Sequence, residues 1–254
     1  MIKLSTVIIA FNEELNIGRC IDSVQSVSDE ILVIDSYSTD KTVNLSTSKG
    51  AKVLQHHFEG YIEQKNYGLQ AAEFDHVLSL DADEALSSGA QLALNQLKNS
   101  WLADAYVLNR RTQYCGKWIN HCGWYPDRKT RLIDRRKGEW AGKNPHDKLI
   151  LKDGGSTQLI KEDILHYSYP NLGVHMNKLN QYSTIAAQEL GQKSFTHLWL
   201  KLIFDPPFHF FRNYVFKKGF LDGGHGLVIC VLSGYMRFSK YAKAIFAKQN
   251  KKVA

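Results

Sequence analysis

The first hundred residues alternate short apolar runs with amphipathic segments, and this alternation constrains the fold more than any other feature. The apolar runs predict strands over residues 6–10, 30–35, 51–54 and 76–80. The segments between them predict helices over residues 14–27, 40–49 and 61–72, the second with Asp40 as its N-cap. Strands that alternate with helices form βαβ units. We therefore expect an α/β fold whose mostly parallel sheet is covered by helices on both faces.

The rest of the chain shows two further patterns. Residues 101–165 hold short mixed runs broken by Gly and Pro, which predicts an irregular, partly antiparallel region. From about Asn171 the periodicity is helical. We expect one α/β domain over residues 1–165 and a helical region over residues 166–254, because 254 residues suffice for a large core.

Polar and acidic residues follow three of the predicted strands. In a parallel sheet, ligands bind beyond the carboxyl ends of the strands. Those positions hold Phe11-Asn12-Glu13, Asp35-Ser36 and Asp81-Ala82-Asp83. Turns without a ligand more often close with Gly, Asn or Pro, although the first two of these segments can also act only as helix caps. The pattern predicts a ligand site at this edge of the sheet.

Asp81 and Asp83 form the strongest candidate metal site. They lie two residues apart after an apolar strand, so a turn can bring both carboxylates to one hard cation. Mg²⁺ and Mn²⁺ prefer oxygen ligands and retain substrate phosphates, so either can stabilise a diphosphate leaving group. The alternative is a solvated acidic turn, and the position after three βα units favours the metal.

Charge is distributed unevenly along the chain. Residues 1–100 hold 7 Lys/Arg and 14 Asp/Glu, whereas residues 101–254 hold 25 and 11. The basic half is expected to meet an anion: a phosphate group, a membrane surface or nucleic acid. Residues 195–254 hold 13 of the 29 aromatic side chains, and on a helical wheel Tyr235, Phe238, Ala242, Ile245 and Phe246 share one face. We expect this region to contact a membrane surface; the alternative is a helical pair packed on the catalytic domain.

Several absences bear on location. No stretch reaches the roughly 18 apolar residues that a membrane-spanning helix needs. Cysteines are few, and no secretory leader precedes the first predicted strand. We expect a cytoplasmic protein, peripheral at the inner face of the cytoplasmic membrane.

The ordered set of motifs resembles family 2 glycosyltransferases. More narrowly, it resembles the lipopolysaccharide core β-1,4-glucosyltransferases of Gram-negative bacteria, over nearly the whole chain. The segments that carry the resemblance are Ala10-Phe11-Asn12-Glu13, Val33-Ile34-Asp35-Ser36, Gln64-Lys65-Asn66-Tyr67, Asp81-Ala82-Asp83-Glu84, Trp124-Tyr125-Pro126-Asp127, Arg131-Leu132, Pro145-His146-Asp147-Lys148 and the tail from Arg212 to Gly224.

This resemblance implies a GT-A fold, with a nucleotide-sugar half over residues 1–100 and an acceptor half over residues 101–165. It implies a metal-dependent, inverting hexosyltransferase that moves a sugar, glucose, from a UDP-sugar to a glycolipid such as the lipopolysaccharide inner core. Asp81 and Asp83 would bind Mg²⁺ or Mn²⁺. The residues that would contact the nucleotide-sugar are Phe11, Asn12, Glu13, Asp35, Lys65, Asn66 and Asp81. The chain departs from many relatives in having Phe11 in place of Tyr.

An inverting transfer needs a carboxylate to take the proton of the acceptor hydroxyl. The resemblance indicates Asp147, where many relatives have Glu, and Asp127 is the second choice. An ion pair with Lys148 or Arg131 is the alternative interpretation of Asp147. His146 is a further candidate, as the base or as a third metal ligand. Arg128 and Arg131 would clamp the diphosphate or a phosphorylated acceptor.

Other functions stay open. A nucleotidyltransferase would want a Gly-rich phosphate loop after the first strand, and Phe11-Asn12-Glu13 is not one. A non-enzymatic membrane or nucleic-acid adaptor explains the basic tail but leaves three polar strand ends without a role. A polyprenyl-phosphate carrier competes with the glycolipid as acceptor. We expect the glycosyltransferase, with a lipid-linked glycan acceptor and no nucleic-acid partner.

Overall fold

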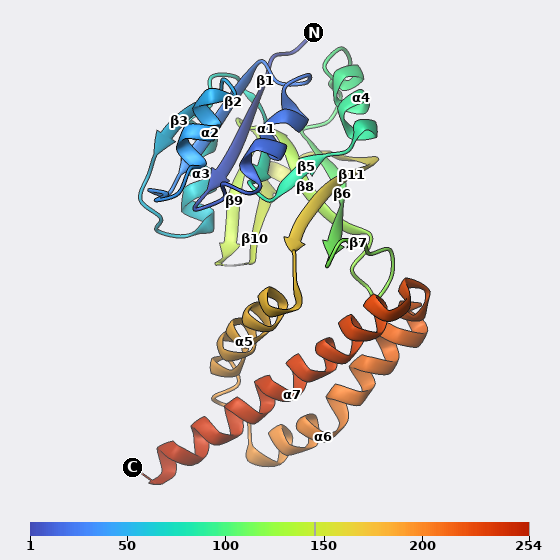
Figure 1. Cartoon of the computed structure of the whole chain (residues 1–254). Coiled ribbons are helices and arrows are strands. Elements are labelled where there is room, and N and C mark those ends of the chain that lie inside the picture. The colour runs from blue at the N-terminus through green and yellow to red at the C-terminus, as the bar shows by residue number, and fades with distance from the viewer. Residues whose placement is uncertain (145, 254) are drawn as a thin grey trace. The chain divides into compact units, whose positions relative to one another are not determined.

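The structure is a computed structural model that describes residues 1–144 and 146–253, without the side chains of residues 146, 153 and 251–253. The chain divides into two compact units (Figure 1). The sheet unit comprises Met1–Arg111 and Asp127–Tyr167, and the helical unit comprises Thr112–Pro126 and the chain from Ser168 onward. The second unit thus includes residues 112–126, which lie within the predicted acceptor half.

Within the described residues, a nine-stranded sheet runs in the order β3-β2-β1-β4-β8-β6-β11-β5, and β7 pairs with β6. Two more strands, β9 and β10, form a separate antiparallel pair. The strands are β1 (Leu4–Ala10), β2 (Glu30–Asp35), β3 (Lys52–Gln55), β4 (His76–Asp81), β5 (Glu84–Leu86), β6 (Ala105–Tyr114), β7 (Lys117–Trp118), β8 (Asp127–Asp134), β9 (Gly138–Lys143), β10 (His146–Leu151) and β11 (Thr157–Tyr169).

The first four strands pair in parallel, as the alternation of strands and helices predicts. Strand β1 lies between β2 and β4, and all seven of its residues are buried. A parallel strand with helices on both faces has no solvent side, which explains its continuous apolar sequence. Because the first four strands run in parallel, their carboxyl ends lie at one edge of the sheet. There Ala10 pairs with Asp35 and Ile9 pairs with Asp81.

Helices cover both faces of this sheet. On one face, α1 (Ile17–Val24), α2 (Thr42–Ser48) and α4 (Ser88–Leu97) contribute to a core with Ile8, Val33 and Leu80. On the other, α3 (Tyr61–Ala71) and the β9–β10 pair pack over Val7 and Ile34. The predicted α/β class, with a mostly parallel sheet and flanking helices, is confirmed.

Some local expectations need correction. Helix α1 begins three residues later and ends three earlier than the pattern predicts. Helix α2 has Lys41 at its N-cap; Asp40 stands one residue earlier and accepts a hydrogen bond from the Thr42 amide at 2.9 Å. The region over residues 101–165 is antiparallel in part, as predicted, but it is regular rather than irregular: β6, β8 and β11 continue the sheet beyond β4.

The helices of the second unit are α5 (Leu172–Gln188), α6 (Phe195–Phe211) and α7 (Gly223–Val253). The short helical turns η2 (Arg212–Phe216) and η3 (Gly219–Asp222) join α6 to α7. Helix α7 packs against both α5 and α6, with Leu198, Tyr241 and Ile245 in the core between them. Asn171 and Ser194 cap α5 and α6 through their side chains. Within the described chain, no helix is both long and apolar enough to span a membrane.

The predicted face of α7 is divided between core and solvent. Tyr235, Phe238 and Phe246 are exposed, whereas Ile245 is buried against α5 and α6 and Ala242 is half-buried. Lys243 of α7 donates a hydrogen bond to the backbone oxygen of Asn180 on α5 at 2.9 Å. The helix therefore packs within its unit along one side and exposes aromatic rings on another.

Candidate active site

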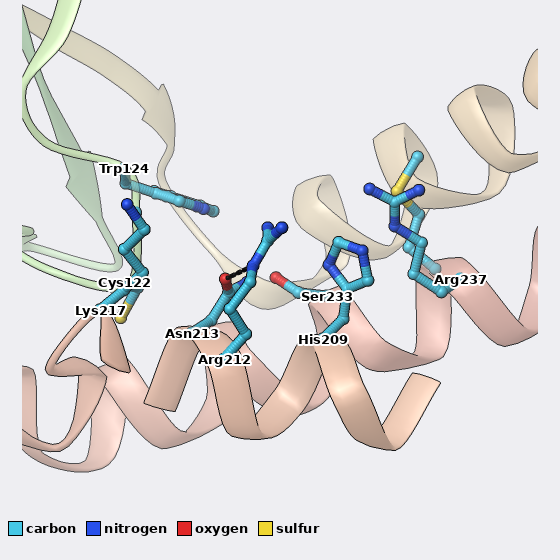
Figure 2. A pocket seen from close by; sticks show the side chains of 10 residues that line it. Cys122, Trp124, His209, Arg212, Asn213, Lys217, Ser233 and Arg237 are labelled. Atoms are coloured by element: carbon cyan, nitrogen blue, oxygen red, sulfur yellow. Dashed lines mark hydrogen bonds between the residues drawn. The ribbon is translucent and has the colours of Figure 1, made fainter. Parts of the chain in front are cut away.

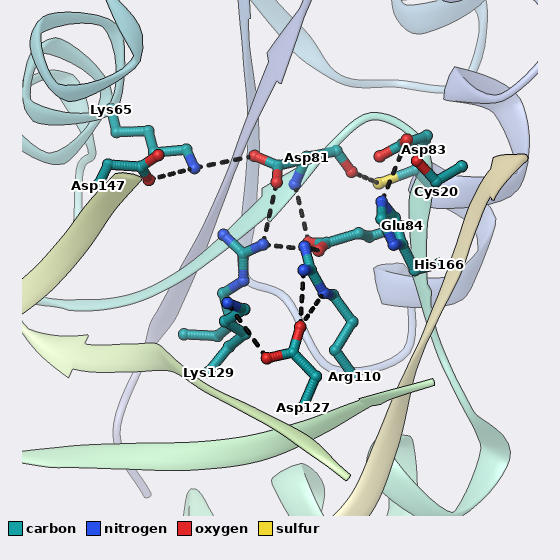
Figure 3. A network of polar contacts seen from close by, with 12 residues as sticks. Cys20, Lys65, Asp81, Asp83, Glu84, Arg110, Asp127, Lys129, Asp147 and His166 are labelled. Carbon is teal, nitrogen blue, oxygen red and sulfur yellow. Dashed lines mark hydrogen bonds and ion pairs between the residues drawn. The ribbon is translucent and has the colours of Figure 1, made fainter. Parts of the chain in front are cut away.

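Asp81 ends strand β4 at the carboxyl edge of the parallel strands. Its two carboxylate oxygens face two cations: Oδ2 lies 2.9 Å from Arg131 Nη2, and Oδ1 lies 3.1 Å from Lys65 Nζ. Lys65 also donates to Asp147 Oδ2 at 2.8 Å. Helix α3, strand β4, strand β8 and strand β10 thus each supply one charged group to the same place (Figure 3).

Further ion pairs connect to this group through Arg131. Arg131 Nη2 is 2.6 Å from Glu84 Oε1, and Glu84 is fully buried. Arg110 binds Glu84 at 3.4 Å and Asp127 at 2.7 Å. We call the whole set the acid–base network; its members are Lys65, Asp81, Glu84, Arg110, Asp127, Arg131 and Asp147.

The network keeps Asp81 and Arg131 charged. Burial would raise the pKa of Asp81, but the adjacent Arg131 and Lys65 cations outweigh it and hold this pKa well below its usual range. Burial would lower the pKa of Arg131, and the charges of Glu84 and Asp81 reverse that shift and raise it. Asp81 therefore stays ionised across physiological pH.

Asp83 sits apart from this network. Its Oδ2 lies 3.3 Å from His166 Nε2, and the two side chains are 20% and 13% exposed. The pairing of β11 with β5 brings His166 opposite Glu84, and the Tyr167 amide donates to the Asp83 carbonyl at 2.8 Å. Sequence reasoning missed His166, because nothing in its local pattern indicates that its strand lies beside β5.

The metal-binding potential of this edge rests on few groups. Within the described residues, no cluster of three His, Cys, Asp or Glu side chains forms a ready-made metal cage. Asp83 and His166 supply a carboxylate and an imidazole at one point, with Asp81 on the same turn. Mg²⁺ and Mn²⁺ commonly use one or two protein carboxylates plus substrate phosphates, so this donor set fits such a cation.

Asp35 has an unsatisfied oxygen. The carboxylate is fully buried at the end of β2; its Oδ2 accepts from the Ser38 amide at 3.0 Å, but its Oδ1 has no hydrogen-bond partner. A buried acceptor without a donor costs about 1–3 kcal/mol, so its retention favours a ligand donor. A ring N–H of a nucleobase is such a donor.

The loop after β1 lies next to the loop after β2. Asn12 adopts a left-handed backbone conformation with φ 53°, which Asn tolerates better than most residues. Its amide donates to Ser38 Oγ at 2.8 Å, and its side-chain oxygen accepts from the Thr39 amide at 2.8 Å. Phe11 is 58% exposed, and Glu13 accepts from the Asn16 side chain at 2.8 Å. Phe11 therefore presents an open aromatic face at this edge.

Other predicted site residues are held by the protein itself. Both amide atoms of Asn66 bond to the backbone of Trp140, at 2.7 and 2.9 Å, and so tie α3 to β9. Asp147 pairs with Lys65, rather than with Lys148 or Arg131 as the alternative supposed. Asp127 also lies 3.2 Å from Lys129 Nζ. Of the two predicted clamp residues, Arg131 is buried within the network, whereas Arg128 is exposed. The side chain of His146 and the whole of Pro145 lie outside the described residues.

Comparison with known proteins agrees with this arrangement. Residues 5–154 match the model of the family described as glycosyl transferase family 2. A protein named as an uncharacterized glycosyltransferase of Rickettsia felis is 30% identical over 96% of this chain and 89% of its own length. A protein named lipopolysaccharide core biosynthesis glycosyltransferase LpsC, of Rhizobium meliloti, is 28% identical over 95% and 94%.

Solved structures give a weaker likeness. A glucosyl-3-phosphoglycerate synthase of Mycobacterium tuberculosis, solved with Mn²⁺, UDP and glucosyl-3-phosphoglycerate, is 27% identical over 44% of each chain, with a TM-score of 0.36. The family model covers more than half of the chain. It includes the carboxyl ends of β1, β2 and β4, where Phe11, Asp35 and Asp81 lie. The chain belongs to glycosyl transferase family 2.

Proposed function

We propose that the protein is a metal-dependent, inverting hexosyltransferase that moves glucose from UDP-glucose to a lipid-linked glycan such as the lipopolysaccharide inner core. The choice of UDP-glucose as donor substrate rests on Asp35 Oδ1, which has no hydrogen-bond partner. It lies at the edge of the sheet that also bears Asp81 and Asp83. The acceptor class rests on the likeness to LpsC over nearly the whole of both chains. Family membership supplies the reaction type.

Each group at the edge has a role in this proposal. Asp35 accepts a hydrogen bond from the uracil ring, and Phe11 stacks on the base. Asp83 and His166, with Asp81, hold Mg²⁺ or Mn²⁺, which when bound supplies positive charge for the departing diphosphate. The acid–base network keeps Asp81 ionised and fixes its orientation. Lys65 forms ion pairs with both Asp147 and Asp81 and so fixes their positions relative to each other.

Asp147 is the proposed base. Among the described residues, its Oδ2 carries the hydrogen bond from Lys65, so Oδ1 is the atom we assign to the acceptor proton. Asp127 stays the second choice, and both Arg110 and Lys129 hold its carboxylate. Arg128, exposed at the start of β8, is the candidate clamp for a phosphorylated acceptor.

The proposed membrane contact rests on the helical unit. It carries 13 Lys/Arg against 3 Asp/Glu. Helix α6 exposes large apolar side chains along one continuous arc, and these are Trp199, Leu200, Ile203, Phe204, Phe208 and Phe211. A basic unit with such a helix suits the interface of an anionic bilayer. It would bring the enzyme to a lipid-linked acceptor at the inner face of the cytoplasmic membrane.

A thermal-shift titration of UDP-, GDP- and dTDP-glucose, with and without Mn²⁺, tests the donor and the metal. UDP-glucose with Mn²⁺ should raise the melting temperature most. Asp83→Asn should abolish the Mn²⁺-dependent part of the shift. Asp35→Ala should weaken UDP binding about tenfold, because it removes the carboxylate that accepts from uracil. Equal shifts with all three donors, or full glucosyl transfer in EDTA, would overturn the proposal.

A further inference from the structure

The helical unit contains a pocket that the proposed reaction does not use. It has a volume of ≈ 490 Å³, and all of its lining residues come from this unit. The loop residue Trp124 forms part of one wall, His209 and Arg212 come from the end of α6 and the start of η2, and Lys217 and Arg237 complete the basic lining (Figure 2).

The cations of this pocket have little compensating charge. In the described part of the chain, neither Arg212 nor Lys217 has a carboxylate partner; Arg212 Nε only donates to Asn213 Oδ1, at 3.4 Å. Arg237 has one acid, Asp205, at 4.0 Å. Figure 2 shows the Arg212 guanidinium standing out from its own helix. Three cations that line one pocket, with one acid at 4.0 Å from one of them, favour binding of an anion.

Apolar side chains also line the pocket, and one of them is Met236 of α7. The indole of Trp124 adds an aromatic surface on which a sugar or acyl group can lie. The pocket thus combines a place for a phosphoryl group with apolar surface beside it.

We infer that this pocket binds the phosphoryl group of a phosphorylated amphiphile, through Arg212 and Lys217. Arginine suits phosphate because its planar fork donates two parallel hydrogen bonds, and lysine adds a point charge. If the proposed function holds, the amphiphile is the lipid-linked acceptor or a lipid beside it; this identification rests on the proposed function. Phosphate binding itself does not depend on glucosyl transfer.

The test measures binding to the full-length protein by isothermal titration calorimetry. EDTA is present, so that a metal-dependent diphosphate site binds no probe. The probes are dihexanoyl phosphatidic acid, below its micelle-forming concentration, and glycerol 3-phosphate; they share a phosphate monoester and differ in the acyl chains. Arg212→Gln and Lys217→Gln should each weaken binding about tenfold. Lys201→Gln removes the same charge from an exposed position on α6 outside the pocket and should change affinity less than twofold.

The outcomes separate the two proposals. Tighter binding of the lipid than of glycerol 3-phosphate supports the proposal. Equal binding of the two probes would overturn the assignment of an amphiphile, because the acyl chains would then add nothing. Equal loss in all three variants, or no loss in Arg212→Gln and Lys217→Gln, overturns it. Asp83→Asn should leave phosphate binding unchanged while it abolishes glucosyl transfer. A failure of the proposed activity can therefore be distinguished from a failure of phosphate binding in the pocket.

Discussion

At the scale of single residues, the two acids of the Asp81-Ala82-Asp83 turn are in different environments. Asp81 forms ion pairs with Lys65 and Arg131, whereas the Asp83 carboxylate lies 3.3 Å from the imidazole of His166. A cation that approached Asp81 would have to compete with two fixed positive charges. Asp83 is therefore the acid we expect to matter most for the metal, and Asp81 the one that matters most for stability.

We predict that Asp81→Asn lowers the free energy of unfolding by about 1.5–3 kcal/mol at neutral pH, because it removes charged hydrogen bonds from the poorly exposed Arg131 and Lys65. The matched control is Asp22→Asn, which breaks an exposed ion pair with Lys49 and should change little. Urea unfolding of the three proteins measures the difference. Equal effects of the two substitutions would contradict the structural role of the network.

The same residue gives a pH dependence. The folded pKa of Asp81 lies below its unfolded value of about 3.9, so the unfolded chain binds a proton first as the medium is acidified. Its stabilising contribution is complete above that unfolded value and is lost as pH falls toward the folded pKa. The stability gap between wild type and Asp81→Asn should therefore be constant from pH 7 to 5 and narrow toward pH 3. A gap that widens there would show the opposite shift.

The two candidate bases differ in a way that kinetics can separate. Asp147→Asn should lower kcat about 10²–10⁴-fold with little change in the KM for the donor, as loss of a general base does. Asp127→Asn should instead act through Arg110 and leave kcat within about tenfold. Initial rates at varied UDP-glucose and acceptor concentrations measure both. The reverse ranking would transfer the role to Asp127.

At the scale of elements, α3 lies unusually close to the sheet through Gly68. A Cβ added there would clash with Val7 Cγ1, whereas one added at Gly18 of α1 would meet only the flexible side chain of Lys49, at 3.1 Å. Both glycines are helical, so Ala raises helix propensity at each. This pair of sites separates propensity from packing.

We expect Gly68→Ala to destabilise the protein by about 1–3 kcal/mol, since the overpacking of β1 exceeds the gain in propensity. Gly18→Ala should be neutral or stabilising by up to about 1 kcal/mol. Thermal or urea unfolding of each variant gives the sign. A stable Gly68→Ala variant would mean that α3 can move away from β1 at little cost.

At the scale of the whole molecule, charge and exposed apolar surface both concentrate in the helical unit. Leu200 on α6 and Leu92 on α4 of the sheet unit are 52% and 66% exposed, and both carry the same side chain. Leu200→Ser should weaken binding to vesicles that contain phosphatidylglycerol about three- to tenfold, and Leu92→Ser should not. Co-sedimentation at 0.1 and 0.5 M NaCl should show a further salt-dependent loss in every variant, because screening weakens the basic unit's attraction. If both leucine variants lost vesicle binding equally, α6 would not be part of the membrane-binding surface.

The sequence by itself determined the order and type of the early elements. Strands 30–35 and 76–80 and the helix that begins at Tyr61 could be predicted because apolar periodicity and turn residues are local signals, and each element satisfies its own backbone nearby. The strand-end acids could be predicted for the same reason: a βα unit directs its strand end to one edge of the sheet.

Only the tertiary structure decided what those acids touch. Arg131 reaches Asp81 from 50 residues away, and Lys65 reaches Asp147 from 82, because the sheet places β8 beside β4 and α3 beside β9. His166 meets Asp83 because β11 pairs with β5, and residues 112–126 belong to the same compact unit as the helices although β7 pairs with β6. Strand order and long-range ion pairs leave no periodic trace in the sequence, since they depend on how complete elements pack rather than on neighbouring residues.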